Sequence, residues 1–548
     1  MNSIPLLVFS LVAFALAYRF YGTFLAQTFA LDPLRKTPAI ERNDGQDFVP
    51  AKNWWVLFGH HFSSICGAGP IVGPALACAY WGWGVALIWL IVGGIFMGAV
   101  SDFSSLVISM RSRGESIAQV SGIEISKRVR LIFSIFLWIA LVLVIAVFSI
   151  FGAKTFIQEP DAIIPSIGLI PTAILVGWLM YRTRLNNVIG TLIGLVVLIV
   201  LLIIGTQIEV VLNAYGSITP TQIWIGILLI YCFIASVIPV QVLLQPRDYL
   251  ASFILFAVII TGIVSIIFVH PNMQSPAFIA WKPESFAKAG PLWPMLFVTV
   301  ACGAISGFHS LVSSGTTCKQ IASETHACRI GYGGMLLESI VGVMVLIMVA
   351  AGLQRTEVIS LLSEGGPISV FSHGYGNISQ IFLGDYGRSF AVLGLNAFIL
   401  TTLDSATRIT RYLTTEIFGI QNKYLATGIA VIAAGALALS GQWNILWPVF
   451  GTSNQLIAAI ALLIAACWLT RQGKKIRFVF IPACLMMVTT LGSFAYLLKQ
   501  SLHIGEAKGP EWILVTLCAV LIVLSVIIFT DAFAVLQGKK IRTGEPIL

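Results

Sequence analysis

Hydrophobic residues occur along this chain in long blocks, and short polar segments separate one block from the next. A block of about 20 apolar residues is long enough for a helix to cross the hydrocarbon core of a bilayer. We count fifteen such blocks in the 548 residues. They lie near 3–21, 53–81, 82–108, 130–155, 162–181, 187–208, 221–244, 248–270, 291–317, 331–353, 389–407, 424–441, 444–470, 477–498 and 512–536. Because a helix satisfies its own backbone polar groups, the pattern predicts an all-α polytopic membrane protein with about fifteen transmembrane helices.

The composition supports this class, since 58% of the residues are hydrophobic and only 10% are charged. An odd number of spans places the two termini on opposite sides of the membrane. With the N-terminus outside, 25 of the 32 Lys and Arg residues fall in inward-facing segments. This excess predicts an N-terminus outside and a C-terminus inside. It also explains the net charge of +9 without nucleic acid as a partner.

The block 53–81 is interrupted in its middle by a short run of small residues and proline. The run consists of Gly67, Ala68, Gly69 and Pro70. Glycine permits conformations that other residues resist, and proline removes a helix hydrogen-bond donor. A helix broken at mid-membrane usually lines a cavity, and the positive end of its second half suits a carboxylate. We therefore predict that this break contacts the substrate; the alternative is a proline kink packed between helices.

A second interruption is predicted in the block 221–244, around Ala235, Ser236 and Pro239. It lies five spans after the block 53–81 and runs in the opposite direction. Two interrupted spans in this relation are typical of a five-plus-five inverted repeat. The two breaks then face each other across the repeat axis, and we predict that Ser236 and Pro239 also contact the substrate.

The repeat predicts how the chain is divided, with a membrane core over residues 53–407. The predicted parts are an extra N-terminal helix with its loop at 1–52, a first repeat at 53–208, a second repeat at 221–418 and four additional helices at 419–548. No loop between the spans is large enough for a soluble domain of ordinary size.

Hydroxyl side chains line one face of the block 291–317. Ser306, Ser310, Ser313 and Thr317 recur at i, i+4, i+7 and i+11, which places them on one side of a helix. Hydroxyls that face freed backbone carbonyls provide oxygen ligands for sodium. We predict that Ser310, Ser313 and Thr317 take part in ion coupling. The alternative is ordinary packing, because serine and threonine are common between membrane helices.

Four titratable residues lie well inside apolar blocks, namely His60, His61, His309 and Glu338. Intramembrane ionisable residues are costly, and histidine changes its charge near neutral pH, so these residues predict proton coupling. Adjacent helical residues point about 100° apart, and we expect only one of the two neighbouring histidines to face the cavity. The alternative is that the histidines are neutral and satisfied by neighbouring groups. A zinc site lacks a fourth ligand at useful spacing, so we predict no metal site.

Other polar residues favour structural roles. Asp404 has Arg408 four residues later, which predicts an ion pair on one helix face, and Asp102 lies near a helix end. Asn454 and Gln455 are interpreted as hydrogen-bond partners between helices. The chain has no GxxxxGK[ST] loop for a nucleotide. Transport, with no cofactor, then runs on a gradient of H⁺ or Na⁺.

Five segments carry a resemblance to a known family. They are FGHHFSSICGAGPIVGPALA (58–77), LLQPRDYLASF (243–253), ISGFHSLVSSGTTCKQ (305–320), LTTLDSATRITRYL (400–413) and WPVFGTSNQLIAA (447–459). In these segments the chain resembles the carbon starvation protein CstA family. The resemblance implies an inner-membrane transporter used in nutrient scavenging under carbon starvation, with peptides or pyruvate as substrates. It also implies a relationship to LeuT-like transporters of the amino acid–polyamine–organocation superfamily.

We interpret the protein as a secondary active symporter in the lipid bilayer that imports a small carboxylate-bearing solute. Short peptides are the first substrate class, and pyruvate carried with a proton is the alternative. A membrane-embedded metalloenzyme that uses His60, His61 and Glu338 is a rival hypothesis, and a nutrient sensor without transport is another. The sequence leaves the oligomeric state open.

Overall fold

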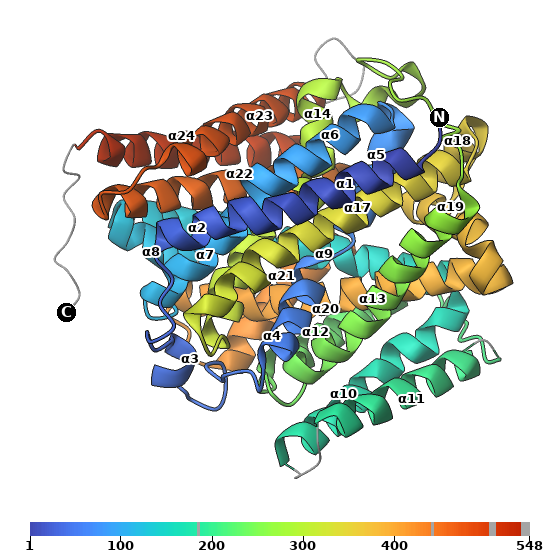
Figure 1. Ribbon diagram of the computed structural model, residues 1–548, viewed down its shortest axis with the longest axis horizontal. Coiled ribbons are helices and arrows are strands. Elements are labelled where there is room, and N and C mark those ends of the chain that lie inside the picture. Colours follow the sequence, from blue (N-terminus) through green and yellow to red (C-terminus); the bar gives the residue numbers. More distant parts are fainter. Residues whose placement is uncertain (183–186, 206, 440–442, 503–510, 539–548) are drawn as a thin grey trace.

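The computed structural model describes residues 1–182, 187–205, 207–439, 443–502 and 511–538. Within this part, twelve helical segments are long and apolar enough to cross a membrane, and a bent pair of helices brings the number to thirteen. The long helices lie side by side in one bundle, with the N-terminus at one end and the end of α24 (Trp512–Leu536) at the other (Figure 1). The chain is therefore a multi-pass, all-helical membrane protein.

The helices follow one another along the chain as two groups. The first group is α1 (Ile4–Leu16), α2 (Gly22–Phe29), α3 (Pro38–Glu41), α4 (Trp54–Ile65), α5 (Gly69–Tyr80), α6 (Trp83–Gly93), α7 (Ala99–Arg111), α8 (Ile117–Glu124), α9 (Lys127–Gln158), α10 (Ile163–Arg182), α11 (Asn187–Gly205), α12 (Pro220–Val237) and α13 (Leu244–Val269). The second group is α14 (Leu292–Thr299), α15 (Ala301–Ala304), α16 (Gly307–Gly315), α17 (Gly333–Gly352), α18 (Arg355–Glu364), α19 (Gly366–Leu383), α20 (Gly387–Phe418), α21 (Lys423–Ala438), α22 (Trp443–Arg471), α23 (Arg477–Ser501) and α24 (Trp512–Leu536).

Twelve of the fifteen predicted spans coincide with the twelve membrane-capable segments. The block 53–81 is the bent pair α4 and α5. The block 291–317 is divided into three short helices, α14 to α16, and the block 424–441 is the 16-residue helix α21. The segment 354–388, which lies between two of the predicted spans, forms α18 and α19.

The first interruption lies where the sequence predicts it. α4 ends at Ile65, α5 begins at Gly69, and the two helices are bent by 41°. A Cβ atom added at Gly69 would lie 2.2 Å from the Cβ of Cys302, a distance that real side chains do not adopt. Glycine is thus required because another helix approaches the backbone closely at this point.

The predicted interruption around Ala235–Pro239 is wrong in kind, because it is the end of a helix. α12 stops at Val237, Ile238 is extended with φ −74° and ψ 144°, and the turn that contains Pro239 leads to α13. The residue before a proline disfavours the helical conformation, which explains the helix end. The second interruption lies instead at Ile305–Ser306, between α15 and α16.

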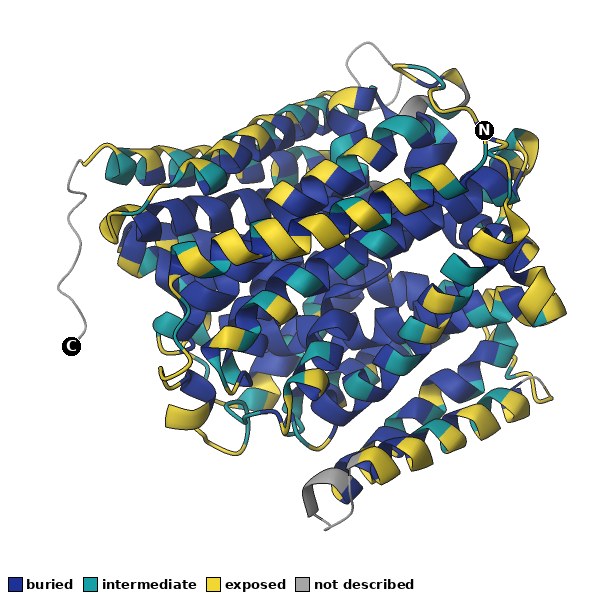
Figure 2. Cartoon of the chain, viewed as in Figure 1, coloured by how far each residue is buried: buried dark blue, intermediate teal, exposed yellow. Residues whose placement is uncertain are grey.

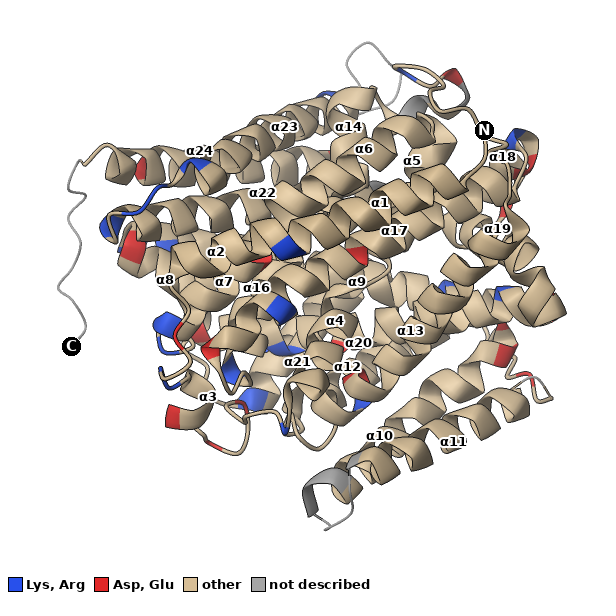
Figure 3. Ribbon diagram, in the orientation of Figure 1, with Lys and Arg blue, Asp and Glu red and all other residues tan. Residues whose placement is uncertain are grey.

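The bundle has a buried centre and a more exposed periphery (Figure 2). Every residue in the apolar window of α22 is buried, whereas only 22% of the corresponding window of α24 is buried. The helices α10 and α11 form a pair at one side of the bundle, and α10 contacts α13 (Figure 1). Lys and Arg residues gather at the end of the bundle where α3 and α8 lie (Figure 3).

Candidate functional site

The two interruptions lie against each other at the centre of the bundle. Gly69, at the start of α5, contacts Cys302 on α15, and Gly303 packs against Pro70. Gly67 packs against Phe148 of α9 and against α20. Broken helices in contact at mid-membrane are the usual location of a transporter's binding site.

Two hydroxyl groups from one neighbouring helix form hydrogen bonds with the carbonyl groups near the first break. Thr401 Oγ1 on α20 donates to the carbonyl of Ser63 at 2.5 Å. Thr402 Oγ1 donates to the carbonyl of Ser64 at 3.2 Å. An unsatisfied backbone group in a membrane costs several kcal/mol, so these bonds stabilise the end of α4.

Side chains of two other helices likewise form hydrogen bonds with the polar groups at the second break. Ser339 Oγ on α17 donates to the carbonyl of Gly303 at 3.0 Å. At the start of α16, the backbone N–H of Phe308 donates to Asn454 Oδ1 at 2.7 Å, and Asn454 Nδ2 donates to Ser306 Oγ at 3.0 Å. Asn454 therefore caps a half-helix from α22, which lies beyond the predicted core.

His60 connects the first break to α13. Its Nδ1 lies 2.7 Å from Asp248 Oδ2, and Gln320 Nε2 lies 3.1 Å from its Nε2. If Gln320 donates to Nε2, the proton of a neutral His60 is on Nδ1 and is donated to Asp248. Ser64 Oγ donates to the same carboxylate oxygen at 3.2 Å. The His60 and Asp248 side chains are fully buried.

Arg247 lies between two buried carboxylates, and one of them also contacts this histidine. It forms an ion pair with Asp404 and lies 3.7 Å from Asp248 Oδ1. The Tyr231 hydroxyl donates to Asp404 Oδ2 at 2.6 Å. The predicted ion pair of Asp404 with Arg408 is wrong, because Arg247 of another helix forms the ion pair with this carboxylate instead.

A second cluster joins three helices beside the second break. His309 Nδ1 on α16 lies 3.1 Å from Asp102 Oδ2 on α7, and His309 Nε2 lies 3.0 Å from Glu338 Oε2 on α17. All three side chains are at most 1% exposed. One imidazole between two buried carboxylates can hold an exchangeable proton, because burial penalises each uncompensated negative charge.

The two neighbouring histidines of α4 face different helices, as adjacent helical residues should. His61 Nδ1 lies 2.9 Å from Thr317 Oγ1, whereas His60 faces α13. The hydroxyls of the predicted face likewise have hydrogen-bond partners on several different helices. Ser310 Oγ lies 2.8 Å from Ser101 Oγ on α7, and Ser306 is bonded to Asn454. Ser313 Oγ is buried and has no hydrogen-bond partner among the described residues.

Ser236 lies outside the centre of the bundle where the interruptions meet. Its Oγ is 3.3 Å from Thr427 Oγ1 on α21, and Pro239 is in the turn after α12. Within the described residues, no group of three or more His, Cys, Asp or Glu side chains has an arrangement that could hold a metal ion.

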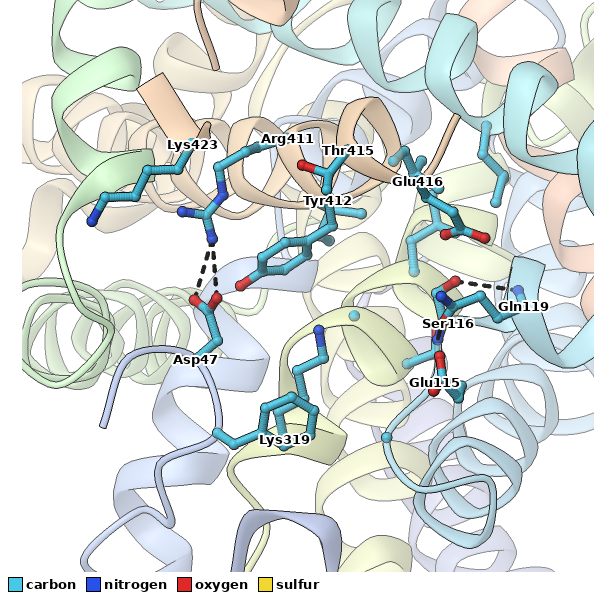
Figure 4. Close-up of a pocket in the computed structure, with 18 of the residues that line it drawn as sticks. Asp47, Glu115, Ser116, Gln119, Lys319, Arg411, Tyr412, Thr415, Glu416 and Lys423 are labelled. Atoms are coloured by element: carbon cyan, nitrogen blue, oxygen red, sulfur yellow. Dashed lines mark hydrogen bonds and ion pairs between the residues drawn. The ribbon is translucent and has the colours of Figure 1, made fainter. Parts of the chain in front are cut away.

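A polar pocket of about 660 Å³ opens at the end of the bundle that holds α3 and α8 (Figure 4). It extends inward to Leu311, Ser314 and Gly315 of α16 and to Ile409 of α20. Its charged lining residues are the basic Arg42, Arg130, Lys319, Arg411 and Lys423 and the acidic Asp47, Glu115 and Glu416. An excess of basic side chains attracts anionic solutes to this pocket.

Asp47 connects the loop before α4 to α20 at this pocket. Its Oδ1 lies 3.1 Å from Arg408 Nη1. The same oxygen lies 3.2 Å from Arg411 Nη2 (Figure 4). Burial by itself would raise the pKa of Asp47, but Arg411 and Arg408 hold its pKa below the ordinary value of 3.8. The carboxylate is therefore ionised at neutral pH and fixes the start of α4 to α20.

The polar pocket does not reach the two interruptions in this conformation. Beyond Leu311, the helices α9, α16 and α22 enclose a void of about 10 Å³ beside Phe308 and Asn454. A void of this size holds about one water molecule. The polar pocket thus gives a solute no path to the breaks through this point, and the predicted contact of Gly67–Pro70 with substrate stays a prediction.

Sequence reasoning missed three features of this site. Asp102 was treated as a helix-end residue, and Thr401 and Thr402 were not considered, although all three contact residues of the breaks or clusters. Asp47 lies in a polar loop that carries no membrane signal. The hydroxyls in the run LTTLDSAT were the available clue, because polar residues inside a membrane helix need partners.

Comparison with known proteins places these features in a family. The chain matches the family described as carbon starvation protein CstA over residues 2–361 and 351–493. It is 35% identical to the peptide transporter CstA of Campylobacter jejuni, over 89% of this chain and 79% of that protein. It is 30% identical to the pyruvate/proton symporter BtsT of Escherichia coli, over 89% of this chain and 81% of that protein.

The fold is similar to that of a solved manganese transporter from Eremococcus coleocola. The TM-score is 0.55 at 11% identity, over 91% of this chain and 99% of that chain. At this identity the likeness shows the fold alone. The family match, in contrast, extends over most of the sequence. The chain belongs to the carbon starvation protein CstA family.

Proposed function

We propose that the protein is a secondary active transporter that imports a small carboxylate-bearing solute through the inner membrane by symport with protons. Short peptides are the first substrate class, and pyruvate is the alternative. The observation that carries the proposal is the contact between two interrupted helices that each adjoin a buried histidine–carboxylate cluster. The names of the relatives, a peptide transporter and a pyruvate/proton symporter, support both substrate classes.

We further propose a LeuT-like five-plus-five repeat whose second half begins at α14. The pair α10 and α11 lies at one side of the bundle, so it is treated as an insertion. The first repeat is then α4–α5, α6–α7, α9, α12 and α13, and the second is α14–α16, α17, α20, α21 and α22. With the N-terminus outside, the two interrupted spans run in opposite directions, as an inverted repeat requires.

The hydrogen bonds of the hydroxyl groups and the charge of the buried cluster favour the proton as the coupling ion. The hydroxyls of Ser310 and Thr317 are engaged with Ser101 and His61, so they are less suited to surround sodium. The Asp102–His309–Glu338 cluster, in contrast, carries excess negative charge when its imidazole is neutral. Proton uptake reduces that charge, which makes protonation favourable at a buried site.

In the proposed cycle the two repeats rock against each other around the interruptions. The polar pocket, at the end with most Lys and Arg, is the cytoplasmic exit. The Asp47 ion pairs with Arg408 and Arg411 join the loop before α4 to α20. They therefore oppose a movement of α4 relative to α20. Protonation of His309 or of its carboxylate partners changes the attraction between α16, α7 and α17, which couples the proton to the second break.

The decisive experiment measures uptake of labelled dialanine and labelled pyruvate into proteoliposomes, with proton and sodium gradients imposed separately. Accumulation of either solute that is driven by the proton gradient alone supports the proposal and identifies the substrate class. Accumulation driven only by sodium contradicts the choice of ion. Saturable binding of a solute without uptake under any gradient contradicts transport and favours a sensor.

A further inference from the structure

A groove of about 540 Å³ runs along the outer face of the bundle between α1 and α4, with α17 as its floor. Its lining residues come from these three helices and from the π-helical turns Ala17–Tyr21 and Cys328–Tyr332. They are Leu11, Phe14, Ala15, Tyr18, Trp54, Trp55, Phe58, Arg329, Gly333, Leu336, Leu337 and Ile340. All but one are uncharged, so the walls resemble the lipid surroundings, and the single charged residue marks one end.

The length of the groove matches one leaflet of a membrane. From Arg329 to Ile340 the chain advances eleven residues, which is about 16 Å at the helical rise of 1.5 Å per residue. Half of the hydrocarbon core of a bilayer is about 15 Å. An extended acyl chain therefore fits along α17 when the charged end of the groove lies at the headgroup level.

The charged end carries the features of a membrane interface. Arg329 is exposed and takes part in none of the ion pairs or hydrogen bonds of the described residues. Its guanidinium lies 5.1 Å from the ring centre of Trp54, which stacks on Trp55 at 3.9 Å. Tryptophan and tyrosine are enriched at the headgroup level, and a basic residue beside a groove between membrane helices suits an anionic headgroup.

We propose that this groove binds an anionic phospholipid. Arg329 contacts its phosphate, and one acyl chain lies between α1 and α4 against Leu336 and Ile340. An uncharged slot alone would accept any lipid tail, and the unpaired cation supplies the preference for a negative headgroup. The inference is independent of which solute the protein transports.

The position of the groove gives the lipid a consequence for the centre of the molecule. Trp54, Trp55 and Phe58 form one wall, and they belong to α4, the half-helix that ends at the first interruption. The same helix carries His60 on its inner side. A bound lipid holds the outer side of α4 in its present position and opposes its displacement.

Native mass spectrometry of the full chain, released from nanodiscs of equal parts phosphatidylglycerol and phosphatidylcholine, tests the proposal. Arg329→Gln is expected to lower the ratio of retained phosphatidylglycerol to phosphatidylcholine about fivefold, as expected for one basic residue near an anionic lipid. Arg128→Gln, which removes another exposed basic residue away from the groove, should leave the ratio unchanged. Equal ratios in wild type and Arg329→Gln overturn the proposal.

A second variant tests the acyl-chain part of the groove. Ala15 is exposed on α1, so the larger side chain of Ala15→Trp can extend into the groove without disturbing the core. This variant should retain less of both lipids. If it does not fold, quenching of tryptophan fluorescence by phosphatidylglycerol with brominated chains provides the readout. Stronger quenching than by brominated phosphatidylcholine, lost in Arg329→Gln, supports the site; equal quenching by the two lipids overturns it.

Discussion

Glu338 of α17 and His309 of α16 face each other across the second interruption, with Oε2 and Nε2 3.0 Å apart. The other ring nitrogen of His309 faces Asp102. The remaining titratable groups around the cluster are His61 on α4, Cys66 at the first break and Cys302 on α15. The imidazole thus lies between two carboxylates that belong to α7 and α17, two helices that pack against the interrupted segment.

Glu338→Gln should uncouple transport from the proton gradient. The amide retains the shape of the side chain but cannot ionise, so the cluster loses one of its two ionisable carboxyl groups. A gradient of one pH unit supports about tenfold accumulation per coupled proton. The variant should lose this accumulation and still exchange labelled for unlabelled solute across proteoliposomes. Glu364→Gln, at an exposed position on α18, is the matched control, and wild-type accumulation by Glu338→Gln would contradict the role of the cluster.

Removing the hydroxyl that satisfies the end of α4 should destabilise the fold. Thr402→Val keeps the shape of the side chain but leaves the carbonyl of Ser64 without this donor. An unsatisfied buried acceptor costs about 1–3 kcal/mol. Thr407→Val is the control, because Thr407 donates to the carbonyl of Leu403 within its own helix. Thermal unfolding in detergent should show a clearly lower midpoint for Thr402→Val only.

A methyl group at Gly69 should prevent the two interruptions from meeting. The new Cβ would lie 2.2 Å from the Cβ of Cys302, so Gly69→Ala should reduce the yield of folded protein or abolish transport. Gly226→Ala, on α12 with no atom within 4 Å of the added Cβ, should be tolerated. The double variant with Cys302→Gly removes the clashing atoms and should restore folding. Failure of this rescue would show that the close approach is not the reason for glycine.

The ion pairs of Asp47 should make stability depend on pH in a defined direction. Since its pKa lies below the ordinary value of 3.8, the stabilisation is complete above that value and is lost as the pH falls through the lower pKa of the folded protein. Asp47→Asn should therefore be less stable than wild type by about 1 kcal/mol at pH 7, and it should unfold at a lower temperature. The difference should shrink as the pH falls below 3.8, measured as melting temperature against pH for both proteins. A difference that stays constant as the pH falls through this range would contradict the ionic explanation.

The sequence predicted the parts of the fold that depend on local composition. Apolar blocks revealed most spans, and the Gly67–Pro70 run located the first interruption, because both signals act within a single helix. The second interruption at Ile305–Ser306 contains no proline, so the sequence pattern indicates the proline after α12 as the interruption instead. α21 and α14 to α16 are shorter than a full span, which hydropathy alone does not distinguish.

The candidate site was less predictable because its contacts join distant segments. Asp404 and Arg408 are correctly spaced for an ion pair along one helix, yet the tertiary fold brings Arg247 to Asp404. His309 and Glu338 were identified as intramembrane titratable residues, but nothing in their spacing shows that Asp102 completes the cluster. Spacing rules describe neighbours on one helix, whereas this site is assembled by packing between helices.

The small void beside Phe308 and Asn454 has a consequence for the membrane itself. It holds about one water molecule, so no continuous file of water connects the polar pocket to the interruptions through this point. Protons move readily along connected water molecules and poorly through packed apolar side chains. In this conformation the close packing of α9, α16 and α22 acts as electrical insulation at this point, as the proposed proton symport requires whenever no solute is being carried.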